Sequence, residues 1–440
     1  MLGTGGSDPS PEGRLVASGC CEMAADATAD RAHHRRRLAG RDPREEHRTA
    51  TPLELLFDLT FVVAFGIAAD ELAHYLAQGQ VWSGVGGFAF ATFAVAWAWI
   101  NYSWFASAYD TDDWVFRLAT MVQMVGVIVL ALGLHQAFAS IVQGDTLDNG
   151  VMVAGYVVMR VPMVFLWAQV ARDDPARRRA ASIYIWTISV AQVVWVVLAI
   201  VDLPIGTTFA IALVPLAIEM SGPRIAERRR GGTPWHARHI AERYGLLVII
   251  TLGEGILGTV ASINAVVHGS SGWTVTAAVV AIAGIGLIFA TWWTYFVIPW
   301  ADVLEVHRER SFIWGYGHIV LFGSLAAIGA GLHVAAYYLE HETTLTLTGT
   351  VLSTVIPVAI YIAVLYGLYA SFTHHVDPFH LSLLGASAGV LGLAVGLAVL
   401  GVSIAICLLV VMLTPVVTVL GYERLGYRHV QEALSRMRVG

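Results

Sequence analysis

The chain has 440 residues, and charged residues make up 13% of them, against about 25% in soluble proteins. With 57% hydrophobic residues and a mean hydropathy of +0.66, this composition excludes a soluble enzyme, a disordered chain and a disulfide-rich secreted domain. The net charge of −6 and the lack of a basic domain give no reason to expect a nucleic-acid partner. The composition predicts a multi-pass helical protein whose partner is the lipid bilayer.

The first 50 residues differ from the rest of the chain. They are rich in Gly, Ala, Asp and Arg and contain no apolar stretch long enough for a signal peptide, so we expect a disordered tail. A helix is predicted to start directly after this tail. Thr51 suits the N-cap, Pro52 the first helical position and Glu54 the third position of a capping box.

Apolar runs of about 20 residues follow, each long enough to cross a bilayer. They cover approximately residues 53–77, 82–107, 115–142, 151–171, 181–201, 205–221, 243–266, 273–299, 313–338, 345–371, 380–398 and 402–421. The predicted fold is therefore an all-α integral membrane bundle of about twelve transmembrane helices over residues 51–425. A short tail at 426–440 follows it.

Arginines cluster in alternate loops, which supports this helix count. They lie in the tail, at Arg117, in the loops at 172–179, 224–243 and 308–310, and after the last helix. The intervening loops at 143–150 and 268–273 contain none. Because short cytoplasmic loops carry the excess of positive charge, we expect both termini in the cytoplasm.

Short matches in the same order relate residues 51–222 to residues 239–422. The sequence GLHQA ends at Ala137 and GLHVA ends at Ala335, each late in the third helix of its half. Such matches predict a six-plus-six repeat whose halves have parallel topology. Transporters with this arrangement usually have a cavity between the halves.

Charged residues inside the apolar runs are candidate functional groups, because a charge at the bilayer centre costs at least about 3 kcal/mol. Asp58 lies past the first turn of its helix, and it suits either an ion pair between helices or a proton site. Arg160 falls in the middle of the fourth run and needs a partner. Glu254, within LGEGILG, is the natural complement, and we expect the two to meet near the bilayer midplane. Asp58, Arg160 and Glu254 are the predicted intramembrane charge site for a substrate or protons.

A supporting polar cluster is predicted around the start of the seventh helix. Its members are Glu54, His239, Glu242, Arg243 and His318. His239 and Glu242 share a helical face at a spacing that suits metal ligands, but two ligands are too few to predict a metal site. We therefore interpret the cluster as a structural interface, and His318 as a hydrogen-bonded core histidine rather than a proton relay.

The loop YDTDDWVFR, between the second and third helices, contributes four more charged residues: Asp110, Asp112, Asp113 and Arg117. A solvated acidic turn is the plain interpretation. A cytoplasmic gate is the alternative.

Several segments resemble one bacterial family. They are TPLELLFDLTFVVAF at 51–65, YVVMR ending at Arg160, HIAERYGLLVIITLGE at 239–254 and GHIVLFGSLAAIGAGL at 317–332. Together they resemble the low temperature requirement A proteins, over about residues 51–425. The family positions carried over are Glu54, Phe57, Asp58, Arg160, His239, Glu242, Arg243, Gly245, Glu254 and His318. The resemblance implies a multi-pass protein of the bacterial cell membrane, in a family named for growth in the cold, and it implies no defined activity.

The leading functional hypothesis is a secondary transporter or permease for an unidentified small solute, with proton coupling left open. A membrane-embedded or lipid-modifying enzyme that uses the histidines and glutamates is the first alternative, although no GxSxG or HExxH motif supports it. A non-catalytic membrane scaffold is the second. A cavity between the halves, lined by the first, fourth, seventh and tenth helices, would favour transport. No cofactor is expected.

Overall fold

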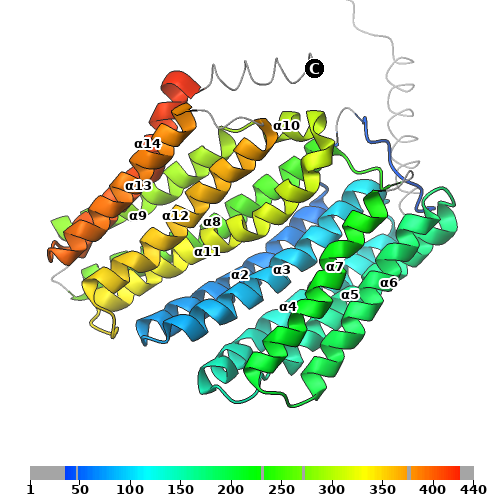
Figure 1. The fold of residues 1–440 in the computed structure, drawn as a ribbon, viewed down its shortest axis with the longest axis horizontal. Helices are drawn as coiled ribbons and strands as arrows, with labels where there is room; N and C mark the ends of the chain where they lie inside the picture. The colour runs from blue at the N-terminus through cyan, green and yellow to red at the C-terminus, as the bar shows by residue number, and fades with distance from the viewer. Residues whose placement is uncertain (1–34, 46–47, 229–231, 270–272, 374–377, 427–440) are drawn as a thin grey trace, which may run out of the picture.

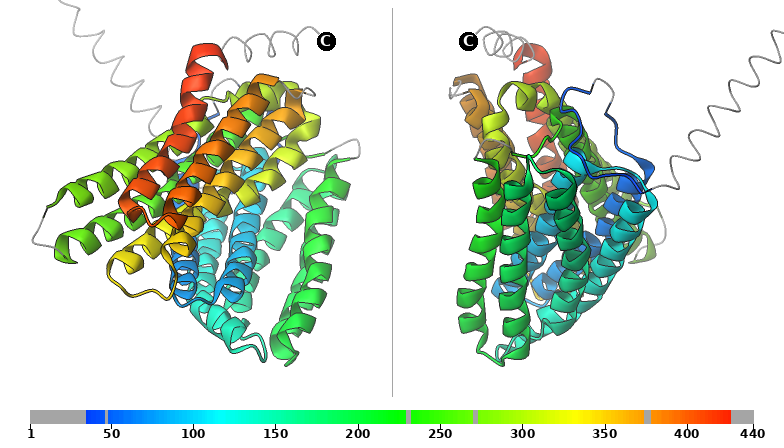
Figure 2. Two further views of the ribbon diagram at one scale, coloured as in Figure 1. Left: turned by 60° about the vertical axis from the view of Figure 1, so that its left-hand side comes forward. Right: turned by 90° about the vertical axis from the view of Figure 1, so that its right-hand side faces the viewer.

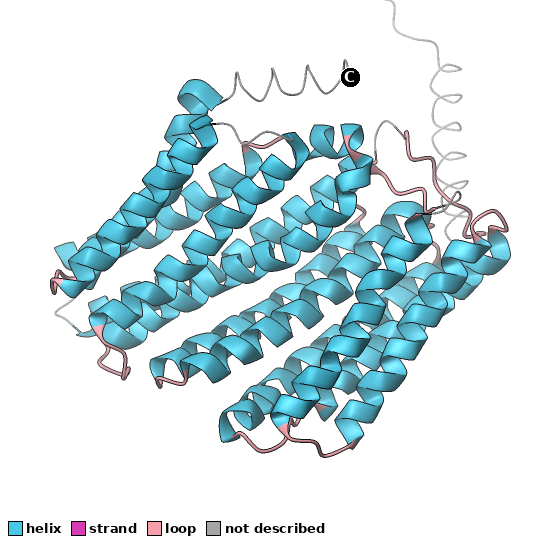
Figure 3. Cartoon of the chain, viewed as in Figure 1, coloured by secondary structure: helices cyan, strands magenta, loops and turns pink. Residues whose placement is uncertain are grey.

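The computed structural model describes residues 35–45, 48–228, 232–269, 273–373 and 378–426. Over these ranges the fold is a helical bundle without a strand (Figure 3). The helices of the first half are α2 (Pro52–Ala77), α3 (Val81–Tyr109), α4 (Trp114–Gln143), α5 (Gly150–Asp173), α6 (Arg178–Ile200) and α7 (Ile205–Glu227). Those of the second half are α8 (Ala237–Gly269), α9 (Val275–Phe296), α10 (Trp300–Val306), α11 (Ser311–Leu339), α12 (Leu347–Thr373), α13 (Pro378–Val399) and α14 (Ile404–Gly421).

The prediction of a multi-pass helical fold is confirmed. Within the described ranges, 12 helices are long and apolar enough to cross a membrane, and each corresponds to one predicted run. Two of them extend further than predicted, since α7 continues to Glu227 and α8 begins at Ala237. Their extra turns carry charged residues, which helices tolerate beyond the apolar core of a bilayer. The short helix α10 and the single turns at 308–310 and 422–426 were not predicted.

The start of α2 confirms the predicted capping box. The Thr51 hydroxyl accepts a hydrogen bond from the backbone N–H of Glu54 at 3.3 Å, and the Glu54 carboxylate accepts one from the backbone N–H of Thr51 at 2.8 Å. Pro52 occupies the first helical position, where its missing N–H costs nothing. These contacts fix the first turn of α2 and place Glu54 inside the bundle.

Helix α11 lies at the centre of the molecule. It packs on α8 and α12 in its own half and on α2 and α3 of the other half (Figures 1 and 2). Its apolar window is 89% buried, against 28% for α6, α7 and α13, which face outward. The two halves therefore meet along α2, α3, α8 and α11. The six-plus-six repeat within this arrangement stays a prediction.

The described chain starts and ends at the same end of the bundle (Figure 1), which we call the arginine-rich end. The link between α7 and α8 and the turn at 308–310 lie there too. The location of this end in the cytoplasm stays a prediction.

Residues 35–45 and 48–50, predicted as part of a disordered tail, instead lie across the arginine-rich end as a strap. The backbone N–H of Arg36 donates to Asp113 at 2.8 Å, and that of Arg41 donates to the carbonyl of Ala108 at 2.9 Å. The disorder prediction is wrong for this part, because its partners lie on distant loops that the local composition does not reveal. Residues 1–34 and the C-terminal tail from 427 lie outside the described residues.

Candidate functional site

A buried ion-pair network joins α2 to α8 near the arginine-rich end. Arg243 of α8 contacts both carboxylates of α2: its Nη1 lies 3.0 Å from Glu54 Oε1, and its Nε donates to Asp58 Oδ2 at 3.0 Å. A second bond from Arg243 Nη2 to Asp58 Oδ1 makes that pair bidentate. All three side chains have 1% or less of their surface exposed. One buried guanidinium thus contacts two buried carboxylates.

Three further groups complete this network. Trp99 of α3 donates its indole N–H to Asp58 Oδ1 at 2.7 Å, and His239 Nε2 lies 3.2 Å from Glu54 Oε2. Arg48 of the strap lies 3.8 Å from Glu54. The network therefore ties the strap, α2, α3 and α8 together, and it occupies the lone pairs that Asp58 would need to bind a solute.

The other members of the predicted supporting cluster lie elsewhere. Glu242 accepts a hydrogen bond from the backbone N–H of Ala50 at 3.4 Å, at the edge of the network. His318 is fully buried and hydrogen-bonded to the Tyr295 hydroxyl at 3.0 Å and the Trp314 carbonyl at 2.8 Å. His318 thus lies in the core, and its interpretation as a structural histidine rather than a proton relay stays a prediction. The structure brings together Glu54, His239 and Arg243 from the predicted cluster.

The four residues of the proposed gate have separate roles. Asp113 caps α4 by accepting from the backbone N–H groups of Val115 and Phe116, and Arg117 pairs with Asp112 at 2.8 Å in solvent. Asp110 is buried, just outside the span, and lies 3.7 Å from Arg48. Burial, reinforced by the charge of Glu54, raises the pKa of Asp110 to about 6, although Arg48 opposes the shift.

Arg160 of α5 pairs with Glu219 of α7, so its predicted pairing with Glu254 is wrong. Arg160 Nη2 lies 3.0 Å from Glu219 Oε2. Glu219 also accepts from Trp97 at 2.5 Å, Tyr156 at 2.6 Å and Gln192 at 3.1 Å, so α3, α5, α6 and α7 meet at one carboxylate. Glu219 was not among the candidate residues predicted from the sequence. Its place inside an apolar run was the signal that would have found it.

Glu254 of α8 has no hydrogen bond or ion pair with any residue that the structure describes, although only 3% of its surface is exposed. It lies where α2, α8 and α11 meet. A methyl group at Gly66 of α2 would lie 2.9 Å from Glu254 Oε1, and one at Gly329 of α11 would lie 2.7 Å from the Glu254 backbone. The two glycines therefore leave just enough room for this carboxyl group.

Two carboxylate–histidine pairs lie toward the opposite end of the bundle. Asp70 Oδ1 is 3.2 Å from His333 Nδ1, and Glu71 Oε1 is 2.7 Å from His135 Nδ1. Asp70 is 66% exposed and is close enough to Glu254 for their charges to interact. The pair of Asp70 and His333 thus lies at the surface, within electrostatic range of the buried carboxyl group.

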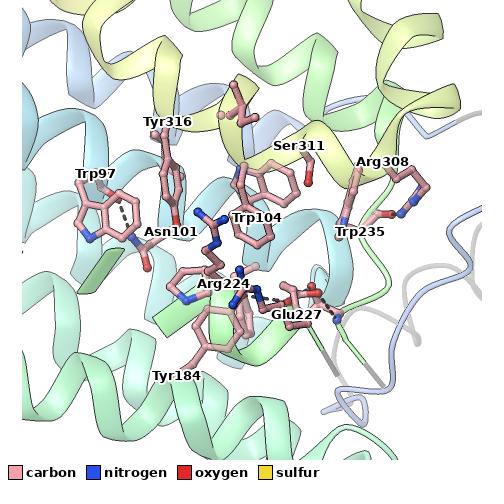
Figure 4. Close-up of a pocket in the computed structure, with 18 of the residues that line it drawn as sticks. Trp97, Asn101, Trp104, Tyr184, Arg224, Glu227, Trp235, Arg308, Ser311 and Tyr316 are labelled. Atoms are coloured by element: carbon pink, nitrogen blue, oxygen red, sulfur yellow. Dashed lines mark hydrogen bonds between the residues drawn. The ribbon is translucent and has the colours of Figure 1, made fainter. Parts of the chain in front are cut away.

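A cavity of about 550 Å³ opens between the halves at the arginine-rich end (Figure 4). Its walls come from α3, α5, α6 and α7 of the first half and from α11 and the turn before it in the second half. They include Trp97, Trp104, Tyr184, Arg224, Glu227 and Tyr316. A cavity lined by the first, fourth, seventh and tenth helices would have favoured transport, and of these four only the fourth, α5, lines this cavity. Trp97 joins the cavity to the pair of Arg160 and Glu219 by its hydrogen bond to Glu219.

The residues of the enzyme alternative do not assemble into one site. His239, Glu242, Glu254 and His318 have the separate surroundings described above. Among the described residues, no group of three or more His, Cys, Asp or Glu side chains is placed to hold a metal ion.

Comparisons with known proteins agree with the resemblance seen in the sequence. The family described as bacterial low temperature requirement A protein matches residues 49–415. An uncharacterized protein of Rhizobium meliloti (strain 1021) is 25% identical over 305 residues, which are 65% of this chain and 69% of that protein. No solved structure matches this chain.

Proposed function

This chain belongs to the bacterial low temperature requirement A family of membrane proteins, and we propose that it is a secondary transporter for a small solute. The observation that carries the proposal is the cavity between the two halves, because transporters bind their solutes where two halves of a bundle meet. Its volume lies within the range of about 300–1,000 Å³ that is typical of small-molecule sites.

The surroundings of the cavity support this role. Its inner wall is Trp97, which is hydrogen-bonded to the buried pair of Arg160 and Glu219, so an intramembrane charge pair lies directly behind the solute site. In the middle of the bundle, α2, α8 and α11 pack closely around Gly66 and Gly329. In this proposal the solute site opens toward the arginine-rich end, and close helix packing lies beyond it.

Glu254 is the proposed proton site. A buried carboxyl group with no cation beside it is far more stable when it is neutral, so it binds a proton until water or a cation reaches it. Asp70 and His333 offer a route for that proton to the opposite end. Asp58 and Arg160, the other two members of the predicted charge site, are better suited to joining helices because each is held in an ion pair.

Proton movement in liposomes tests both parts of the proposal. The purified chain is reconstituted with a pH-sensitive dye inside, and pooled small metabolites are added outside. We expect solute-dependent proton movement that Glu254→Gln abolishes, whereas Glu340→Gln, at an exposed helix end, leaves it unchanged. Solute uptake that proceeds without protons would contradict the role of Glu254. Absence of uptake by folded protein for every solute class would contradict transport.

A further inference from the structure

The aromatic walls of the cavity form three rigid pairs. Trp167 and Tyr184 stack with their ring centroids 4.1 Å apart and their planes 4° apart. Trp104 meets Trp235 edge-on at 4.8 Å, and Trp97 meets Tyr316 edge-on at 5.4 Å. Side chains held in this way lose little freedom when a ligand binds, and they give the cavity apolar walls that suit an aromatic ligand.

Two charged residues of the cavity already have partners. Arg308 donates to the carbonyl of Trp235 at 2.7 Å and stacks over the ring of that residue at 3.8 Å. Glu227 accepts from the Thr233 hydroxyl at 2.7 Å, the Thr233 backbone N–H at 2.8 Å and the Tyr184 hydroxyl at 3.1 Å. The lone pairs of this carboxylate are therefore occupied, so it is poorly placed to receive a cationic ligand.

Arg224 is in a different situation. It has no hydrogen bond or ion pair with any residue in the described part of the chain, and it extends between Asn101 and Trp104 in Figure 4. The guanidinium of Arg224 is close enough to the Tyr316 hydroxyl for an electrostatic interaction. Arg228, one turn further along α7, lies at the rim and likewise has no ion pair with the described residues. The cavity thus presents an available guanidinium between aromatic walls.

We propose that this cavity binds a planar aromatic carboxylate, with Arg224 as the residue that holds the carboxylate. The guanidinium fork matches a carboxylate in a bidentate geometry, and the aromatic pairs cover the faces of the ring. The inference rests on the proposed function only in treating the ligand as the transported solute. Binding itself requires no transport.

Binding to the full chain in phosphatidylcholine nanodiscs, measured by calorimetry, tests the inference. The probes are benzoate and indole-3-carboxylate, with benzamide and benzylamine as neutral and cationic counterparts and acetate as an anion without a ring. We expect the two aromatic carboxylates to bind at least about tenfold more tightly than the other three, because the carboxylate and the ring each contribute. Equal binding of benzamide or benzylamine would overturn the assignment.

Variants locate the site. Arg224→Gln is expected to weaken benzoate binding by about tenfold, and Arg224→Lys by less, since lysine keeps the charge without the fork. Arg172→Gln, at an exposed arginine outside the cavity, is the matched control and should bind as the wild type does. Unchanged binding in Arg224→Gln would overturn the proposal, and so would loss of benzoate binding in phosphatidylglycerol nanodiscs, which would assign the cavity to a lipid headgroup. Benzoate binding without uptake into liposomes would leave the ligand class standing and contradict transport instead.

Discussion

Asp58 of α2 and Arg243 of α8 form a fully buried, bidentate ion pair across the boundary between the two halves of the bundle. The same guanidinium also neutralises Glu54, and the Trp99 indole holds Asp58 from a third helix. The most prominent charges on α2 therefore hold the two halves together.

Removing one partner of this pair should be severely destabilising. Arg243→Gln leaves the buried Asp58 without a cation and removes the nearer of the two arginines beside Glu54, so we expect a loss of about 3–5 kcal/mol in unfolding free energy. Thermal unfolding in detergent measures the effect. Arg117→Gln, which breaks an exposed pair, should change stability by less than about 1 kcal/mol. A double variant, Asp58→Asn with Arg243→Gln, should recover part of the loss. Equal stability of the two single arginine variants would show that the buried network contributes nothing.

The crossing of α8 and α11 should depend on Gly329. A methyl group there would lie 2.7 Å from the backbone carbon of Glu254, which cannot move aside as a flexible side chain would. We expect Gly329→Ala to cost about 1–3 kcal/mol. Gly367→Ala on α12 is the control, since nothing lies within 4 Å of its added methyl group. A Gly329→Ala variant as stable as Gly367→Ala would contradict the close packing of these helices.

Glu254 should react with a hydrophobic carbodiimide. Such reagents enter the bilayer and modify carboxyl groups that have no cationic partner, whereas Asp58 and Glu219 are each paired with an arginine. We expect mass spectrometry to find the adduct on the peptide that contains Glu254, and Glu254→Gln to remove it. Equal labelling of Asp58 or Glu219 would contradict the distinction between free and paired carboxyl groups.

The stability contributed by Asp110 should depend on pH. Burial raises the pKa of Asp110 from the usual 3.8 to about 6. The folded protein therefore binds a proton at this carboxyl group more tightly than the unfolded chain does. Its contribution is therefore most favourable below about pH 4 and is lost as the pH rises through 6. We expect Asp110→Asn to be more stable than the wild type at pH 7.5, by about 2 kcal/mol, with the difference shrinking at pH 4.5. The melting temperature against pH measures this, with the exposed Asp112→Asn as control. A difference between Asp110→Asn and the wild type that does not change with pH would refute it.

The fold was largely predictable from the sequence, and the partners of the charges were not. Runs of apolar residues mark every spanning helix, since lipid requires a continuous apolar surface, and the capping box marks the start of α2. The partner of Arg160 depends on how α5 and α7 are rotated, which is a property of tertiary packing. Complementary charge alone could not distinguish Glu219 from Glu254.

The cavity was harder still to predict. Arg224 and Glu227 occur in a charged stretch whose sequence is typical of a loop, but in the structure α7 extends through both residues. The strap was missed for a related reason. Its backbone N–H groups donate hydrogen bonds to Asp113 and Asp173, which are more than 70 residues away in sequence. Local sequence patterns cannot predict contacts over such a separation.

The burial of α11 determines how the two halves can move. The helix contacts both halves, so a motion of one half against the other would move α11 past at least one of its neighbours. The middle of α11 contains seven small residues: Gly323, Ser324, Ala326, Ala327, Gly329, Ala330 and Gly331. Residues with little or no side chain let neighbouring backbones approach α11 closely, as Glu254 does at Gly329 and Ser353 at Gly331. A change of shape between the halves would therefore have to separate these close contacts as well as the pair of Asp58 and Arg243.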